Sequence, residues 1–156
     1  MQKPPGLDSP LIPTFLKAMS RTNVWLYRRT GGRIGGKWRV GAAFRKPAPV
    51  CLLNHRGRKT GRELTTPLLF LIDGDRVVVV ASQGGLPTHP QWYRNVEADP
   101  RVTVQTGSTV RAMLARVASP DERAYLWPKL VDLYADFENY QSWTDREIPV
   151  VVCEPA

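Results

Sequence analysis

The sequence predicts a mainly β protein, an antiparallel β-barrel of small size with a few helices on its surface. Residues 76–82 read RVVVVAS directly after the turn residues DGD, which is typical of one arm of a β-hairpin. Residues 101–117 form a second such unit, with RVTVQT, a GS turn and VRAMLARV. Only two helix-like segments interrupt the strands after residue 30, which argues against a doubly wound sheet.

The first thirty residues are expected to form a flexible leader, residues 1–9, and one helix that begins at Ser9 or Pro10 and ends near Arg29. Apolar side chains recur along it at helical spacing, while basic residues occupy other positions. This pattern has two interpretations: a helix packed on the domain, or an interfacial helix that docks on anionic lipid. We therefore divide the chain into residues 1–30, which cover a pocket or meet a membrane, and residues 31–156, the barrel domain.

The strands expected next are KWRV at 37–40, PVCLLNH at 49–55 and LTTPLLFLI at 64–72, with IPVVVCE at 148–154 as the last. Together with the two hairpins they give six or seven strands. The glycine-rich stretch TGGRIGG at 30–36 separates the first helix from the barrel.

Two helices are expected between the strands. Thr88 is predicted to cap the first, with Pro90 in its first turn and its end near Ala98. The sequence SPDE at 119–122 is a capping box that begins the second helix, which extends to about Leu133. Pro128 is expected to kink that helix or restart it.

Composition indicates one globular domain with an anionic partner. The 156 residues include 42% hydrophobic side chains, and 22 basic against 14 acidic residues give a net charge of +8. No apolar run approaches the ~20 residues that span a bilayer, and the N-terminus lacks the apolar core of a signal peptide. We expect a cytoplasmic protein, peripheral on the inner face of the membrane if the first helix binds lipid. Cys51 and Cys153 lie in strand-like runs and are expected to be buried thiols rather than metal ligands.

A cation-rich turn stands between two apolar segments. Residues 55–67 read HRGRKTGRELTTP, in which Gly57 and Gly61 separate four basic residues. Glycines allow successive backbone N–H groups to converge on an anion, and Arg58, Lys59 and Arg62 would add charge around it. The residues leave two interpretations open, a clamp for phosphate or carboxylate and a solvated hairpin.

Two further stretches carry candidate binding residues. In ASQGGLPTHPQWYRN at 81–95, two glycines and a helix N-terminus follow a strand, and Trp92 could form either a pocket wall or part of the core. In LYADFENYQSW, Tyr134, Phe137 and Tyr140 follow three-residue spacing and are expected on one helix face. The sequence shows no Ser–His–Asp set, Cys–His pair or paired catalytic carboxylates. This favours chemistry supplied by a bound cofactor.

Several of these stretches together resemble the deazaflavin-dependent nitroreductase family, oxidoreductases that use reduced coenzyme F-420. The resemblance covers nearly the whole chain and includes MSRTNVWLYRR, GRKTG, PLLFLIDGDRVVVVASQGG, HPQWYRNVEADPRV, DERAYLWPKLVDLY and YQSWTDREIPVVVCEP. It implies a split β-barrel like that of FMN-binding oxidases, and hydride transfer from the reduced deazaflavin to a quinone such as menaquinone, or to another activated alkene or nitro acceptor.

The resemblance also implies roles for individual residues. The anionic tail of the cofactor would lie at Arg58, Lys59 and Thr60, and its groove would be lined by Leu64, Thr65, Thr66, Pro67, Leu68 and Leu69. The deazaflavin would be held by Val80, Ala81, Ser82 and Gln83, and by Gln91, Trp92, Tyr93, Arg94 and Asn95, with its ring near Trp92. The acceptor would lie among Trp25, Leu69, Tyr134, Phe137 and Tyr140. Ser82 would be the catalytic residue that hydrogen-bonds the acceptor or relays a proton, with Tyr134 and Tyr140 as second candidates.

Three positions depart from a nitroimidazole-activating member of that family: Gln83 replaces a lysine, and Leu69 and Phe137 replace tyrosines. The acceptor pocket is therefore expected to be more apolar, and we do not expect nitroimidazole activation. Two alternatives remain at this point, an FMN-binding split-barrel oxidoreductase and a non-enzymatic module for anions or lipid. Nucleic acid is not expected as a partner, because the cations concentrate in the first helix and one turn. No obligate protein partner is evident.

Overall fold

The computed structural model describes residues 11–38, 43 and 46–156, with side chains from residue 21 onward. The helices are α1 (Leu11–Thr30), α2 (Gln91–Ala98), α3 (Pro120–Leu133) and α4 (Asp136–Ser142). The strands are β1 (Lys37–Trp38), β2 (Ala48–Arg56), β3 (Glu63–Leu69), β4 (Leu71–Asp73), β5 (Arg76–Val80), β6 (Arg101–Thr106), β7 (Thr109–Val117) and β8 (Val150–Pro155). The expected leader, the Ser9 or Pro10 helix start, and Arg39 and Val40 lie outside the described residues.

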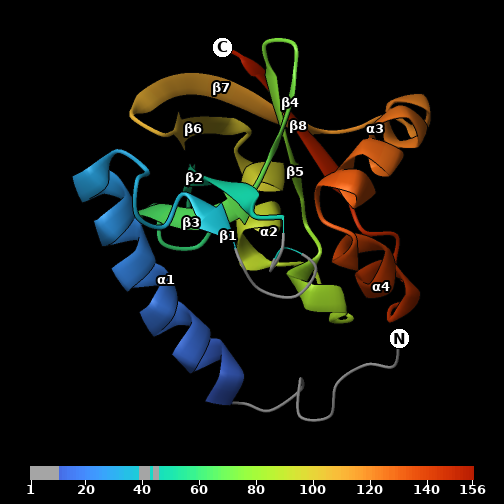
Figure 1. Ribbon diagram of the computed structural model, residues 1–156, viewed down its shortest axis with the longest axis horizontal. Coiled ribbons are helices and arrows are strands. Elements are labelled where there is room, and N and C mark those ends of the chain that lie inside the picture. The colour runs from blue at the N-terminus through green and yellow to red at the C-terminus, as the bar shows by residue number, and fades with distance from the viewer. Residues whose placement is uncertain (1–10, 39–42, 44–45) are drawn as a thin grey trace.

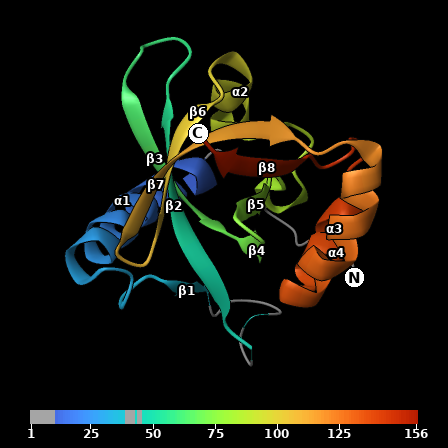
Figure 2. The same cartoon turned by 90° about the horizontal axis from the view of Figure 1, so that it is seen from above.

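The described strands form one antiparallel sheet in the order β1-β2-β6-β7-β8-β5-β4, and β3 pairs with β2 off this path. The sheet curls on itself, with α1 along one side and α3 and α4 on the opposite side (Figure 1). Seen from above, α2 stands apart from these three helices (Figure 2). The mainly β prediction is confirmed, and β2 is the central strand because it pairs with β1, β3 and β6.

Alternation along the strands separates two sets of apolar side chains. On one face, Cys51 and Leu53 join the interior core with Val77, Val79 and residues of α2. On the other face, a second cluster packs β5 and β8 against α3 and α4, and a third packs Val50 and Leu52 of β2 against Tyr27 of α1. The helices on the two sides therefore cover different parts of the outer face of the same sheet.

The structure corrects the expected segment LTTPLLFLI, which is two strands instead of one. β3 ends at Leu69 and pairs with β2, while β4 begins at Leu71 and pairs with β5. Between them, the N–H of Phe70 donates to the carbonyl of Pro49. The apolar run continues through the break because both strands are half-buried there, so hydrophobicity alone does not mark it.

Two helix boundaries also differ from expectation. α2 begins at Gln91 with Pro90 as its N-cap, and the Thr88 hydroxyl instead accepts a hydrogen bond from Gln83. Pro90 disfavours helical backbone at the residue before it, which prevents an earlier start. α3 continues through Pro128 to Leu133, and its predicted capping box is confirmed.

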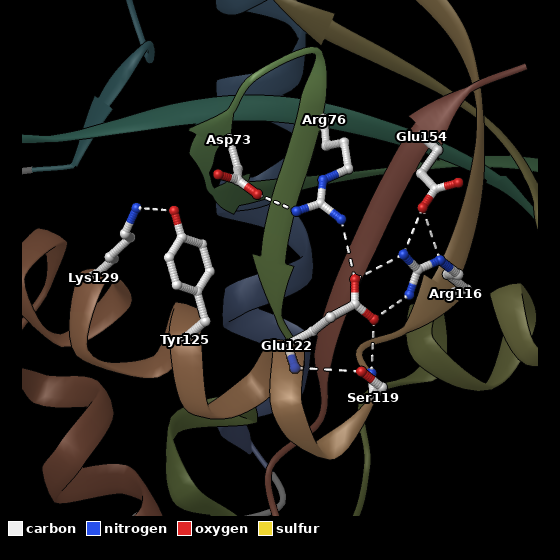
Figure 3. A network of polar contacts seen from close by, with 8 residues as sticks. All are labelled: Asp73, Arg76, Arg116, Ser119, Glu122, Tyr125, Lys129 and Glu154. Atoms are coloured by element: carbon white, nitrogen blue, oxygen red, sulfur yellow. Dashed lines mark hydrogen bonds and ion pairs between the residues drawn. The ribbon is translucent and has the colours of Figure 1, made fainter.

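A network of arginines and carboxylates ties α3 to the barrel (Figure 3). Glu122, whose side chain completes the capping box with Ser119, accepts hydrogen bonds from Arg76 and Arg116. Arg76 also pairs with Asp73, and Arg116 also pairs with Glu154. One carboxylate thus joins β5, β7 and the first turn of α3. The hydrogen bonds from Arg116 and then from the backbone N–H of Ser119 lower the pKa of Glu122 well below its usual range.

A buried histidine ties α2 to the β2–β3 hairpin. The ring of His55 lies 2.9 Å (Nε2) from the Thr66 hydroxyl and 3.1 Å (Nδ1) from the Asn95 amide nitrogen. His55 is only 4% exposed, and burial lowers its pKa from 6.5 to about 4. The imidazole is therefore neutral in the folded protein at neutral pH, with the Asn95 amide donating to Nδ1 and Nε2 carrying the proton toward Thr66.

This burial makes stability depend on pH. Because the folded state disfavours the protonated imidazole, the contribution of His55 is complete above pH 6.5 and is lost as the pH falls toward 4. We expect wild-type protein to lose up to about 3 kcal/mol of unfolding free energy over this interval from His55 alone. His55→Gln, which does not titrate, should lack this part of the loss in denaturant titrations. Carboxylates affect both proteins equally, so parallel pH profiles would contradict the assignment.

Candidate active site

A cavity of about 320 Å³ opens between α1, the barrel and α4. Its walls come from six parts of the chain that are far apart in sequence. The lining residues are Asn23, Tyr27, Gly35, Lys37, Trp38, Val50, Leu52, Pro67, Leu68, Leu69, Val80, Ser82, Gly84, Tyr134, Phe137 and Tyr140. Apolar side chains and phenol rings dominate this set, as in small-molecule sites generally.

The register of β2 and β3 builds the apolar wall. Val50 pairs with Leu69 and Leu52 pairs with Pro67, so these four side chains stand on the same outer face. Val80, the last residue of β5, extends this surface. α1 covers it from the other side through Tyr27, whose hydroxyl accepts a hydrogen bond from the N–H of Gly107 at 2.7 Å and so fixes the helix on the β6–β7 turn.

Aromatic rings close the cavity on the side of α4. Tyr134 and Phe137 meet edge to face with centroids 5.2 Å apart, and Tyr140 lies 6.2 Å from Tyr134. The expected single helix face is wrong, because α3 ends at Leu133, before Tyr134, and α4 begins at Asp136. The break still brings Tyr134, Phe137 and Tyr140 together at the cavity.

A chain of hydrogen bonds joins Trp38, Tyr134 and Tyr140. The indole Nε1 of Trp38, which can only donate, lies 3.4 Å from the Tyr134 hydroxyl oxygen. The Tyr134 hydroxyl lies 3.2 Å from that of Tyr140. With Tyr134 donating to Tyr140, the hydroxyl proton of Tyr140 is left for a further acceptor. Burial, before any other cause, raises the pKa of both phenols, so both are protonated donors at neutral pH.

The segment after β5 forms another wall with a strained backbone. Ser82 and Gly84 line the cavity, and Gln83 between them has a φ of 45°, which is rare for a residue other than glycine. Gly85, with a φ of 78°, packs so closely on α4 that a Cβ there would lie 2.9 Å from the Tyr140 carbonyl oxygen. This contact holds the segment and Tyr140 in a fixed relation.

Arg146 binds the same segment, and sequence reasoning missed it. Its guanidinium donates to the carbonyls of Leu86 (2.9 Å), Ala81 (3.2 Å) and Ser82 (2.7 Å), and Nη1 lies 3.0 Å from Nδ1 of His89. Burial and the neighbouring Arg146 lower the pKa of His89, which serves as a neutral acceptor. In the sequence, an arginine just before a strand that binds backbone carbonyls looks the same as an arginine that is exposed to solvent.

The cation-rich turn lies at the other end of the β2–β3 hairpin. Arg58 is held on α2, since its Nη1 donates to Gln91 at 2.7 Å and to Asn95 at 3.1 Å. Lys59 and Arg62 are exposed, and neither forms an ion pair with a described residue. Gly61 supplies the positive φ of 70° that this turn requires. The turn therefore presents two unneutralised cations beside one that is fixed.

The hairpin connects the turn with the cavity. From Arg62 to Pro67 is five residues along β3, which corresponds to about 17 Å of strand. Between these points, Arg28 of α1 donates to Asn54 and Thr65 on the outer face, at 3.0 Å and 2.7 Å. A ligand with an apolar ring system and a long anionic tail could therefore contact both ends of the hairpin.

Many of the expected site residues lie at one of these two places. Those that line the cavity are Pro67, Leu68, Leu69, Val80, Ser82, Tyr134, Phe137 and Tyr140. Arg58, Lys59 and Thr60 belong to the turn, with Gln91 and Asn95 behind it. Thr65 and Thr66 are engaged with Asn54 and His55, and Leu64 and Arg94 are exposed.

Four expected site residues lie elsewhere. Trp92 and Tyr93 belong to the interior core, as does Ala81. Of the two interpretations left open for Trp92, the structure supports core packing. Trp25 is 61% exposed and does not line the cavity. Asn23 and Tyr27 do, because residues two apart on a helix point in nearly opposite directions. Sequence reasoning also missed Lys37 and Trp38, which lie on a two-residue strand.

Comparisons with known proteins identify the family of this chain. The sequence model of a family described as "F420H(2)-dependent quinone reductase" matches residues 19–155. A putative F420H(2)-dependent quinone reductase of Mycobacterium tuberculosis is 53% identical over 117 residues, which cover 75% of this chain and 98% of that protein. A second F420H(2)-dependent quinone reductase of the same organism is 40% identical over 130 residues, covering 81% of this chain and 83% of its own length.

A solved structure is also similar to this chain. An F420-H2 dependent reductase is 39% identical and superposes with a TM-score of 0.64, covering 68% of this chain and 94% of its own. The split-barrel prediction is thereby confirmed, as are the predictions of an oxidoreductase and of coenzyme F-420 at the level of the family. The chain belongs to the F420H(2)-dependent quinone reductase family.

Proposed function

We propose that this protein binds reduced coenzyme F-420 along the β2–β3 hairpin and uses it to reduce a quinone in the cavity. The observation that carries this proposal is the pairing of two features on one hairpin. One end has Lys59 and Arg62 without ion-pair partners among the described residues, and the other has an apolar cavity with an ordered phenol donor. A polyanionic tail and a ring system require these two environments.

The turn fits the tail of the cofactor. Phosphate and carboxylate groups bind most strongly to charge-assisted donors, and the turn offers Lys59 and Arg62 with the Thr60 hydroxyl between them. Arg58 has a different task, because its guanidinium and its backbone N–H both bind Asn95. It fixes the turn on α2, so that the free cations are presented from a rigid base.

The cavity fits the ring system and the acceptor. When bound, reduced coenzyme F-420 supplies two electrons as a hydride. The side chains of Leu52, Leu69 and Val80 provide an apolar surface that excludes water, and α1 covers that surface through Tyr27. Leu69 and Phe137 carry no hydroxyl, which suits an apolar quinone better than a polar nitroimidazole.

Tyr140 is the proposed proton donor to the acceptor. Reduction of a quinone to a hydroquinone adds one hydride and one proton, so a hydroxyl that faces the cavity completes the reaction. If Tyr134 is the donor in the bond between the two hydroxyls, the hydroxyl proton of Tyr140 is available to the acceptor. Tyr134 and Trp38 orient the donor, and Ser82 lines the cavity as a second hydroxyl.

Loss of a free cation from the turn should weaken cofactor binding. We expect Lys59→Ala to lower the affinity for coenzyme F-420 about tenfold, by roughly 1.4 kcal/mol, and to reduce its salt dependence. Fluorescence titration at low and high salt measures both, with FMN as a parallel ligand. Lys129→Ala removes the same charge from an exposed site on α3 and should bind as the wild type does. Equal affinity of both variants would remove the turn from the binding site.

Removal of the donor hydroxyl should slow the reaction without weakening cofactor binding. We expect Tyr140→Phe to lower kcat with a soluble quinone about a hundredfold. Tyr134→Phe should have a smaller effect on kcat, since it removes only the hydrogen bond that orients the Tyr140 hydroxyl. Steady-state kinetics together with cofactor titration separate rate from binding. A wild-type kcat in Tyr140→Phe, with a slow Ser82→Ala, would transfer the donor role to Ser82.

The exposed side of α1 and β1 is the proposed contact with a membrane that holds the quinone. Trp25, Ile34 and Trp38 are exposed apolar residues in this region, and Arg29 and Arg33 are exposed cations near them. Such a mixture is typical of surfaces that rest on anionic lipid. Within the described residues no helix is both long and apolar enough to cross a membrane. Residues 1–30 would then both cover the cavity and bring it to the lipid.

Vesicle binding tests this contact. We expect the protein to sediment with vesicles that contain phosphatidylglycerol, and only weakly with phosphatidylcholine vesicles or at high salt. Trp25→Ser should reduce binding several-fold. Tyr125→Ser removes an equally exposed aromatic ring (55%) from α3 and serves as the matched control. If both variants bind lipid as the wild type does, this side of the protein is not the membrane contact.

A further inference from the structure

We propose that Arg146 is a positioning residue, which holds residues 81–86 so that the N–H groups of Ser82 and Gln83 form an oxyanion-binding wall of the cavity. This inference deepens the proposed function and rests on it for the identity of the ligand. The hold of Arg146 on the segment does not depend on that function. The ligand group would be a carbonyl oxygen that gains negative charge during the reaction.

Most of the hydrogen bonds that the Arg146 side chain forms go to this one segment. A guanidinium has five N–H groups, and four acceptors surround this one: the carbonyls of Ala81, Ser82 and Leu86, and Nδ1 of His89. Its side chain forms no ion pair with a described carboxylate. All four acceptors are neutral and lie within residues 81–89. The guanidinium therefore fixes the position of this segment.

This arrangement determines where the amides of the segment point. The described peptide bonds are all trans, so each N–H is directed opposite to the carbonyl of the same peptide group. Because the carbonyls of Ala81 and Ser82 face Arg146, the N–H groups of Ser82 and Gln83 face away from it. Neither N–H donates to a described backbone carbonyl. Ser82 itself lines the cavity.

The backbone angles are those of an anion-binding nest. Ser82 is right-handed helical (φ −76°, ψ −36°) and Gln83 is left-handed (φ 45°). A right-handed residue followed by a left-handed one makes successive N–H groups converge on a point. A left-handed glutamine costs energy and persists only where its surroundings enforce it. Arg146 on one side and the contact of Gly85 with α4 on the other supply that constraint.

Two oxygens could accept from this nest: a ring carbonyl of the cofactor, or the oxygen of the quinone as it is reduced. Both present a carbonyl oxygen on which charge grows when electrons arrive, and fixed N–H donors stabilise such charge without reorganisation. An effect on cofactor affinity identifies the first, and an effect confined to kcat with quinone identifies the second.

Arg146→Lys and Arg146→Ala test the proposal against Arg123→Lys as the matched control. Arg123 is also a half-buried arginine that donates to a carbonyl, that of Ile148 at 3.2 Å, and it stacks on Trp127 outside the cavity. Three readouts are needed: hydrogen exchange of the Gly85 and Leu86 amides without cofactor, fluorescence titration with coenzyme F-420, and quinone reduction kinetics. These two amides donate to the carbonyls of Ser82 and Gln83 and so report the order of the segment. Melting temperatures report general destabilisation.

We expect exchange of the Gly85 and Leu86 amides to rise at least about tenfold in both Arg146 variants and to stay unchanged in Arg123→Lys. Cofactor affinity or kcat should fall about ten- to a hundredfold, and guanidinium ion should partly restore Arg146→Ala. Unchanged exchange in Arg146→Lys, or increased exchange with unchanged affinity and kcat, would overturn the proposal. If Arg146→Ala does not fold, the lysine variant decides. Wild-type protein that fails to bind coenzyme F-420 would refute the proposed function, while the exchange data would still report the hold of Arg146.

Discussion

The two faces of β2 are the constraint on which the rest of the structure depends. Cys51, Leu53 and His55 point into the barrel, and Val50 and Leu52 point toward α1. The strand also pairs with β1, β3 and β6, so its position is fixed from both edges. A shift of register by one residue would exchange the two sets and turn the histidine to the outer face of the strand. Core and cavity are therefore specified by the same nine residues.

The polar contacts at the end of β2 extend this constraint to the cation-rich turn. Asn95 of α2 is 2% exposed, donates to His55 and accepts from both the backbone and the side chain of Arg58. One buried amide thus connects the interior of the barrel with the position of the turn. Burial of such groups is costly unless all are paired, and here the pairing gives the turn a defined orientation. The stability of the fold and the proposed binding of the cofactor tail therefore depend on the same residues.

Local signals in the sequence were sufficient for most elements and for part of the site. The valine strand, the GS turn and the SPDE capping box each depend on a few adjacent residues, and all three are found. The structure also places the cation-rich turn between β2 and β3, and it brings Tyr134, Phe137 and Tyr140 together at the cavity. The features that local sequence signals did not determine depend on tertiary packing. Trp92 could be wall or core with equal local justification, and only its place on a helix packed into the barrel decides.

The residues that sequence reasoning missed have long-range partners. Arg146 binds carbonyls about sixty residues earlier in the chain, and Trp38 meets Tyr134 across 96 residues. Every residue has a backbone carbonyl, so the residue types in a sequence do not indicate which carbonyls an arginine binds. The left-handed backbone of Gln83 likewise cannot be predicted from the sequence, because glutamine has no preference for that conformation. Only the two glycines after it indicate that the backbone turns there.

The charges around the cavity agree with a reaction that delivers negative charge. Among the described residues that line it there is one cation, Lys37, and no carboxylate. Tyr134 and Tyr140 remain neutral because burial raises their pKa, and Arg146 lies just behind the Ser82 wall. A carboxylate in this position would repel an arriving hydride, whereas neutral donors and nearby cations stabilise the oxygen that receives the charge. In the proposed reaction, fixed neutral donors would stabilise the charge that arrives with the electrons, and the proton would come from the neutral phenol of Tyr140.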